Sequence, residues 1–574
     1  MRTLKTDLLI LGSGGAGLFA ALHAHQKDPN LSITVAVKGL LGKCGCTRMV
    51  QGGYNVALAK GDSVERHFMD TIEGGKWLPH QDLAWTLVET AIERIHELEN
   101  ELGCFFDRNP DGTIHQKAFA GQTFDRTVHK GDLTGIEIIN RLAEQVWARG
   151  INRLEEHRAV ELVKNEAGDA IAGVLMIDMR TGDFTFVRAQ AVLLATGGGP
   201  TMYKYHTPSG DKTCDGMAMA LRAGLALRDM EMVQFHPTGL LAGTDTRMTG
   251  TVLEEGLRGA GGYLLNGAQE RFMHNYDAKL ERATRDIVSR AIFAEMREGR
   301  VTPNGGVYIA MGHLGAANNR KNFKGMVERC EDCGFDLAGG LVEVVPTAHY
   351  MMGGVVFNVD CTTDVPGLFV AGEDSGGVHG ANRLGGNGVA NSTVFGGIAG
   401  DLMPGWIRAH GQYSEPDRAQ IDFAVARCRA PLARPAKDLN VIREKLYDLM
   451  WDDVGIVRDA ASLARAEGAL DELDAALDAA GVEGGDLAYN LTWHEWMNLK
   501  SLVLVSQSIR VAATAREDSR GAHFRTDFPA VRDLQNSRFT CVTWADGRFA
   551  ADTRPVVFNR VKPGETLIKE VAAA

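Results

Sequence analysis

The segment at residues 7–21, DLLILGSGGAGLFAA, constrains the fold of this chain more than any other. Its apolar residues 8–11 have the composition of a buried parallel strand, and the residues after the glycines have that of a helix. Between them, Gly12, Gly14 and Gly17 follow the spacing GxGxxG. This spacing allows a tight turn, close helix–strand packing, and contact between a diphosphate and the start of the helix. The segment therefore predicts an α/β, Rossmann-like nucleotide-binding fold.

One element of the usual nucleotide motif is missing. The second expected strand, 33–37, is followed by Lys38 where an acidic residue would bind a ribose hydroxyl. Two later segments, 191–199 and 366–373, also read as strands that run into glycines. They favour a single sheet assembled around one long cofactor. Glu373 could then take over a ribose or ribityl hydroxyl.

Composition and charge exclude several classes of protein. The 574 residues carry 61 Lys and Arg against 73 Asp and Glu, a net charge of −12, and no basic run indicates nucleic acid as a partner. The nine cysteines are too irregularly spaced for a disulfide scaffold, and Cys330 and Cys333 form a lone CxxC that predicts no metal site. No apolar run is long enough to span a membrane. We therefore expect a cytoplasmic chain that could lie on the inner face of a membrane through a partner.

Six further motifs occur in order along the chain: QFHPTG at 234–239, EGLRG at 255–259, Arg285-Asp286, PTAHYMMGG at 346–354, HGANRLGG at 379–386 and SRGAHFR at 519–525. With these motifs the chain resembles the flavoprotein subunits of succinate dehydrogenase and fumarate reductase, a superfamily that includes L-aspartate oxidase. The resemblance implies an FAD-dependent oxidoreductase of four-carbon dicarboxylates or close relatives.

The resemblance also implies a division of the chain. It predicts a Rossmann-like FAD-binding domain at residues 1–235 and 350–410, interrupted by a capping α+β domain at 236–349. A C-terminal helical bundle at 411–530 and a tail region at 531–574 follow. The spacing of apolar residues by three and four within 415–516 independently favours helices there.

The resemblance assigns substrate binding to three residues. Arg383 and His349 match the clamp for one substrate carboxylate, and His236 matches the residue that binds the other end. A planar guanidinium suits a carboxylate because it donates two parallel hydrogen bonds.

Proton transfer is assigned to Arg285, which matches the family's proton donor or acceptor. An arginine has a free pKa above 12, so it can act as an acid only if a relay reloads it. Glu255 and Arg258 match that relay.

For FAD, the glycine turns and the resemblance together predict contacts from Gly12, Gly14, Gly15, Gly17, Lys38, Thr47, Gln51, Gly52, Gly53, Thr196, Gly197, Asp215, Glu373 and Asn387. Cys46 stands where membrane-bound succinate dehydrogenases carry a histidine that links FAD covalently. A histidyl link is therefore impossible, and we expect noncovalent FAD. A cysteinyl thioether through Cys46 is the alternative, because a cysteine of lowered pKa is a nucleophile.

Two other positions depart from the family. Lys130 and Gly131 replace a pair of alanines, and Glu254 replaces a threonine that helps to hold a substrate carboxylate. A carboxylate facing a carboxylate repels unless one is protonated or a cation intervenes. Either Glu254 turns outward and Thr249 or Thr251 takes its role, or the substrate carries an ammonium, amide or hydroxyl at that end.

Three functions follow from these residues. The first is the interconversion of succinate and fumarate or of a substituted relative, by hydride transfer at flavin N5. The second is an aspartate-oxidase-like reaction, in which Glu254 would face the substrate ammonium. The third is a flavin electron-transfer subunit without substrate chemistry, which the presence of Arg285 and Arg383 disfavours. Since no other redox centre is encoded, electrons must leave through a partner, and an iron–sulfur subunit is what the resemblance implies.

Overall fold

The computed structural model describes residues 1–244 and 246–569. Its main sheet has seven strands in the order β6-β2-β1-β9-β8-β7, with β16 also paired to β9. β1 is parallel to β2 and β9, and β16 is parallel to β9, whereas β7 and β8 are antiparallel additions. The strands are β1 (Arg2–Leu11), β2 (Ile33–Ala36), β6 (Asn152–Leu154), β7 (His157–Lys164), β8 (Ile171–Asp178), β9 (Asp183–Leu194) and β16 (Leu368–Val370).

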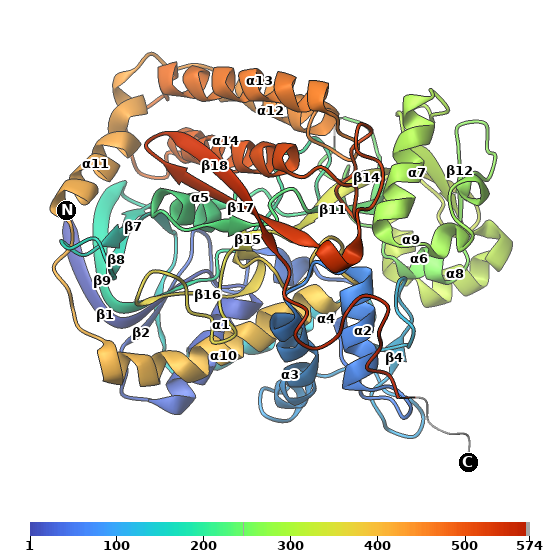
Figure 1. Cartoon of the computed structure of the whole chain (residues 1–574), viewed down its shortest axis with the longest axis horizontal. Coiled ribbons are helices and arrows are strands. Elements are labelled where there is room, and N and C mark those ends of the chain that lie inside the picture. The colour runs from blue at the N-terminus through green and yellow to red at the C-terminus, as the bar shows by residue number, and fades with distance from the viewer. Residues whose placement is uncertain (245, 570–574) are drawn as a thin grey trace.

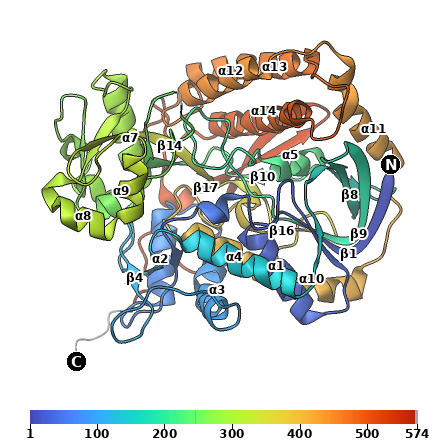
Figure 2. The same cartoon turned by 180° about the vertical axis from the view of Figure 1, so that it is seen from behind.

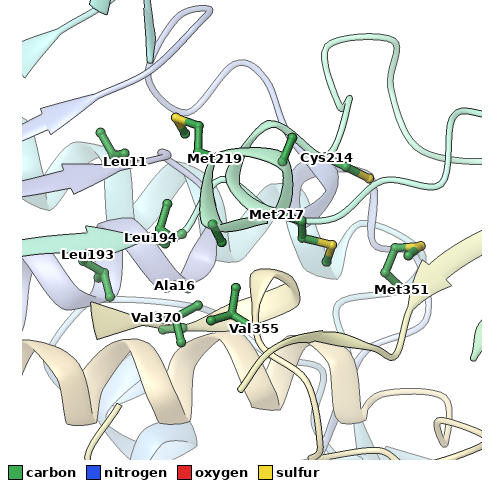
Figure 3. Packing of buried hydrophobic residues seen from close by; sticks show 14 of the residues in the cluster. Leu11, Ala16, Leu193, Leu194, Cys214, Met217, Met219, Met351, Val355 and Val370 are labelled. Carbon is green, nitrogen blue, oxygen red and sulfur yellow. The ribbon is translucent and has the colours of Figure 1, made fainter. Parts of the chain in front are cut away.

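The strand register brings the predicted glycine turns to one edge of the sheet. Leu11 pairs with Ala36 and with Leu194, and Leu194 pairs with Val370, so four parallel strands end at the same level. Figure 3 shows Leu11, Leu194 and Val370 near this edge, with Met217 and Met219 of the neighbouring helix close by. The loops that follow these strands are therefore neighbours, as they must be to share one ligand.

Helices cover both faces of the main sheet. In Figure 2, α4, α1 and α10 lie along one face, and Figure 1 shows α5 and α14 on the other. Gly396 and Gly400 let α10 pack closely on α1, since a Cβ on either would lie 2.5 Å from a backbone oxygen of α1. The helices on the two faces are α1 (Gly15–Lys27), α4 (Thr134–Ala148), α5 (Asp215–Arg222), α10 (Asn387–His410) and α14 (Leu491–Ala515). Two further helices of this part of the chain are α2 (Val64–Gly74) and α3 (Gln81–Asn100).

A second hydrophobic core lies within residues 240–344 and includes Leu257, Ile292 and Val342. We call this part of the chain the cap. Its antiparallel sheet has the order β11-β14-β13-β12, and its helices form the lobe at the right of Figure 1. The elements are β11 (Val233–Leu240), α6 (Gly256–Gly259), β12 (Tyr263–Leu265), α7 (Arg285–Arg297), β13 (Val307–Ala310), α8 (Ala316–Asn322), α9 (Lys324–Glu331) and β14 (Leu341–Met351).

The C-terminal part of the chain returns to the first domain. Four helices, α11 (Arg418–Arg429), α12 (Leu439–Asp452), α13 (Ala460–Ala479) and α14 (Leu491–Ala515), precede a hairpin of β17 (Arg538–Ala545) and β18 (Arg548–Pro555). The hairpin joins β10 (Leu227–Arg228) and β15 (Gly354–Val355) in a sheet of order β15-β10-β17-β18. The region anticipated only as a tail thus contains a hairpin, while residues 570–574 lie outside the described residues.

Candidate active site

Two connected hollows lie at the strand edge described above. The larger has about 1340 Å³ of space between its atoms and extends from the turn before α1 to the cap. The smaller, of about 620 Å³, lies over the ends of β1 and β2. Gly14, Gly197 and Lys212 line both hollows and so form the neck between them. This elongated, two-part shape suits a dinucleotide.

The turn between β1 and α1 has the geometry that its glycines predict. Gly12 has φ +113°, and a Cβ there would lie 2.0 Å from the carbonyl oxygen of Ala195. A Cβ on Gly17 would lie 2.0 Å from the oxygen of Gly12. Only glycine therefore allows α1 to begin this close to β1 and β9. The absent side chains leave the backbone open to a ligand, which fits bound FAD.

Most residues predicted to contact FAD line one of the hollows. Those in the larger hollow are Gly14, Gly15, Thr47, Gln51, Gly52, Gly53, Gly197 and Glu373. Those in the smaller are Gly12, Gly14, Lys38, Thr196, Gly197 and Asp215.

Gly17 and Asn387 line neither hollow. Gly17 serves the packing of α1. Asn387 is fully buried at the start of α10, where its Oδ1 accepts from Asn55 at 2.8 Å and its Nδ2 donates to Thr71 at 3.1 Å. The structure therefore gives Asn387 a place beneath the site, holding α10.

Charged groups at the smaller hollow are paired with each other. Asp215 contacts Lys38 at 2.9 Å and Arg158 at 2.8 Å. Burial opposes its charge, but Arg158 and Lys38 hold the pKa of Asp215 below its usual range. No sequence motif indicated Asp374, which accepts hydrogen bonds from the backbone of Thr196 and from Gly197 at 3.1 Å. Asp374 thereby fixes the end of β9.

The three residues assigned to proton transfer form a buried chain in the cap. Arg285, the first residue of α7, donates from Nη2 to Glu255 at 2.6 Å and from Nη1 to Gln234 at 3.1 Å. Arg258 donates to the other oxygen of Glu255 at 3.3 Å. Although burial opposes ionisation, the two guanidinium groups lower the pKa of Glu255. Arg285 and Glu255 line the larger hollow, and Arg258 lies behind them.

Arg383 faces the same hollow from the loop before α10. Its guanidinium carbon lies 4.5 Å from the centre of the Tyr350 ring, and its Nη1 donates to the oxygen of Leu384 at 3.3 Å. Its buried Nε has no hydrogen-bond partner among the described residues. Burial lowers the pKa of Arg383 to about 10, so the group is a cation at neutral pH. This cation has donors free for an anionic ligand.

Two histidines complete the wall of the larger hollow. His236 on β11 and His349 on β14 have ring centres 5.5 Å apart, and His349 Nδ1 lies 2.8 Å from the Thr207 hydroxyl. Burial and the nearby Arg285 lower the pKa of both histidines. They are therefore neutral imidazoles that can donate hydrogen bonds to a carboxylate. The structure thus places His236, His349, Arg383 and Arg285 on the wall of one hollow.

Glu254 does not turn outward, contrary to one of the two expectations for it. Its side chain is buried and lines the larger hollow, where Lys117 lies 3.4 Å from its Oε2. Burial raises the pKa of Glu254. Thr251 also lines the hollow, whereas the Thr249 hydroxyl donates to the oxygen of Gly243 at 2.6 Å. Lys130 lies outside the hollow and pairs with Asp107.

Cys46 begins a short 3₁₀ helix (Cys46–Met49) and lines the larger hollow. Burial raises the pKa of its thiol to about 12, the opposite of what an activated nucleophile needs. Elsewhere in the described residues, no group of three or more His, Cys, Asp or Glu side chains is arranged to hold a metal. Within the same part of the chain, no helix combines the length and hydropathy needed to cross a membrane.

Comparisons with known proteins identify the family of this chain. The FAD binding domain family matches residues 7–389, and the fumarate reductase flavoprotein C-terminal family matches residues 443–567. One subunit of the fumarate reductase (CoM/CoB) of Methanothermobacter marburgensis is 39% identical over 540 residues, 92% of this chain and 95% of that protein. The 8-methylmenaquinol:fumarate reductase flavoprotein subunit of Wolinella succinogenes is 35% identical, over 97% of this chain and 91% of its own.

The fold also matches a solved structure of a variant of Escherichia coli quinol fumarate reductase, with a TM-score of 0.92 and 32% identity over 98% of this chain and 99% of that one. The predicted α/β fold is confirmed. The chain belongs to the family of succinate dehydrogenase and fumarate reductase flavoprotein subunits. It is an FAD-dependent oxidoreductase of the type that acts on CH–CH donors.

Proposed function

We propose that the protein interconverts succinate and fumarate, or a closely related substituted dicarboxylate. The observation that carries this proposal is the convergence of Arg383, His349 and His236 with the Arg285–Glu255 pair on one hollow. Cations and neutral imidazole donors at separate points of this wall can bind the two ends of a short diacid. Fixing both ends orients the carbon–carbon bond between them, which can supply several kcal/mol of the barrier.

FAD, which the residues lining the two hollows would hold, would supply or accept the hydride. The residues of the chain bind the substrate and transfer the proton. Arg383 binds one carboxylate and stabilises the charge that develops beside it. Arg285 delivers a proton to the neighbouring carbon, or removes one in the reverse direction. When Arg285 has given its proton to the substrate, Glu255, hydrogen-bonded to both arginines, takes a replacement proton from Arg258 and passes it to Arg285.

A dye-linked assay tests this function directly. The purified holoenzyme should oxidise reduced viologen with fumarate, or reduce a dye with succinate, at a rate that saturates with the dicarboxylate. Malonate, a shorter diacid, should compete. Absence of turnover with fumarate, succinate and their 2-substituted relatives would reject the proposal.

The second candidate, an aspartate-oxidase-like reaction, is favoured by one observation. Glu254 presents a carboxylate to the hollow, and a carboxylate is the natural partner of a substrate ammonium. Under this alternative, L-aspartate would be oxidised with oxygen or fumarate as acceptor, and succinate would not be a substrate. Including L-aspartate in the assay separates the two functions.

We also propose that electrons leave through a partner protein, and the first candidate is an iron–sulfur subunit. The support is chemical: flavin is the one redox group that the sequence motifs provide for. Such a partner could hold the chain at the inner face of a membrane. Co-purification from native cells, followed by iron analysis of the complex, tests this point.

A further inference from the structure

The neck between the two hollows carries a charged residue to which no sequence motif assigns a role. Lys212 lines both hollows, together with Gly14 and Gly197. Its Nζ donates to the carbonyl oxygen of Thr196 at 2.7 Å and reaches within 3.5 Å of the position that a Cβ on Gly45 would occupy. The long side chain therefore extends across the neck.

The surroundings keep this side chain charged. Burial acts to lower the pKa of Lys212, but Cys46 and Asp211 nearby outweigh it and raise the pKa above its ordinary value. An ammonium has three donors, and Thr196 takes one of them. The remaining donors are available to a ligand in the neck.

The other side of the neck is also suited to an anion. Gly14 is the N-cap of α1, where the positive end of the helix dipole lies. The Gly15 N–H there donates to the Thr47 hydroxyl at 2.9 Å. Gly14 and Gly197 have no side chains to keep a ligand from the backbone. A dinucleotide that fills both hollows places its diphosphate at the point where they join.

We infer that Lys212 binds the diphosphate of FAD, pairing its ammonium with the phosphate oxygens opposite the N-terminus of α1. The class of ligand is a dinucleotide diphosphate, and the lysine adds a side-chain charge to a site otherwise built from backbone. This inference concerns cofactor retention, so it is independent of the substrate proposed above.

The test is the affinity of the holoenzyme for FAD, measured as flavin retained after serial dilution and as the rate of FAD release into fluorescence. Lys212→Met should raise the dissociation constant at least about tenfold, as expected for loss of a charge-assisted hydrogen bond. Lys212→Arg should stay within about threefold of the wild type, since the charge is kept. Lys43→Met, an exposed lysine on the loop near Cys46, is the matched control and should change nothing.

Salt provides a second measurement, because an ion pair weakens as ionic strength rises. The dissociation constant of the wild type should rise with KCl, and that of Lys212→Met should rise less steeply. Equal affinity of Lys212→Met and wild type, equal losses in the Met and Arg variants, or equal salt slopes would overturn the inference. Should Lys212→Met not accumulate, a wild-type dissociation constant that is independent of salt would overturn it as well.

Discussion

Arg285 and Arg383 face the same hollow but differ in their hydrogen-bond partners. This difference predicts that substitutions of the two residues have different effects on activity. Arg285 is already paired with Glu255, so its proposed role is in chemistry, whereas Arg383 has donors free for a ligand. Arg285→Gln should lose at least about a hundredfold in turnover while inhibitor binding changes less. Arg383→Gln should lose turnover and malonate affinity together. Steady-state kinetics and malonate titration of the flavin spectrum measure both.

Retention of FAD by both variants is the control for these measurements, because neither arginine lies at the neck of the cofactor site. Near-normal turnover of Arg285→Gln on the true substrate would rule out its role as the proton donor.

Glu254 predicts a pH dependence of substrate binding. Because burial raises its pKa, Glu254 takes up a proton at a higher pH than an exposed glutamate. Affinity for a plain dicarboxylate should therefore rise as pH falls through that pKa, since the repelling charge disappears. Glu254→Gln should bind malonate at least about threefold more tightly at neutral pH and lose this pH dependence. Unchanged or weaker binding of malonate by Glu254→Gln would contradict this repulsion.

Cys46 predicts the mode of FAD attachment. Since burial raises the pKa of its thiol to about 12, little thiolate exists to attack the flavin, and FAD should be noncovalent. After acid denaturation and centrifugation, the yellow colour should be in the supernatant. Colour that stays in the wild-type pellet but is released from Cys46→Ser would instead establish the thioether.

The site residues differ in how far sequence could locate them. Arg285 and His349 could be assigned from the sequence because they stand in the motifs that carry the family resemblance, and both line the larger hollow. Asn387 directly follows the motif at 379–386, yet the structure uses it to hold α10. A motif does not tell which of the nearby side chains faces the ligand. Lys212 and Lys117 were missed, because they belong to no motif and reach the site only through the fold.

At the level of helices, a buried charge cluster joins α1, α3 and α10 and predicts a pH-dependent stability. His23 on α1 lies 2.8 Å from Glu97 and 3.0 Å from Asp401, with Arg94 bonded to both carboxylates. Burial acts to lower the pKa of His23, but the carboxylates outweigh it and raise the pKa. Protonated His23 therefore stabilises the folded state at pH values below about 6.5, the pKa of histidine in the unfolded chain. This stabilisation is lost as the pH rises through the pKa of His23 in the folded protein.

The free energy of unfolding of His23→Gln should therefore be lower than that of the wild type. This deficit should be about 1 to 2 kcal/mol larger at pH near 6 than at pH near 9. Urea unfolding of the two holoenzymes at both pH values measures this. The half-buried His25 on the same helix offers the control His25→Gln, which should show no such difference. A His23→Gln deficit that is constant with pH would contradict the role of the imidazolium.

Sequence predicted the elements better than their assembly. The strand at 7–11 and the helices within 415–516 follow from local patterns of apolar residues. The pairing of β17 with β10 could not be predicted, because it joins segments about 300 residues apart and β10 has only two residues. Such a short strand leaves no periodic signal.

In the whole molecule, the C-terminal segments are tied to the first domain by buried charges, so they should be essential for stability. Arg516, after α14, pairs with Glu231 and with Asp229, and Glu231 is fully buried. Arg516→Leu would leave Glu231 without its cation and should cost about 3 to 5 kcal/mol. Arg532→Leu removes an exposed pair with Glu517 and should change stability by less than about 1 kcal/mol. Equal unfolding midpoints for the two variants would refute this account.

β11 and β14 each run from one hydrophobic core into the other: Phe235 and Ala348 belong to the main core, whereas Leu240 and Val344 belong to that of the cap. Arg285, Glu255 and Arg258, the residues proposed for proton transfer, therefore lie on the cap side of these two strands. Arg383 and the neck of the cofactor site lie on the side of the main core. A small tilt of the cap about these two strands would separate Arg285 from Arg383 and leave the neck unchanged. We therefore expect such a tilt to open the substrate end of the larger hollow while the cofactor end keeps its shape.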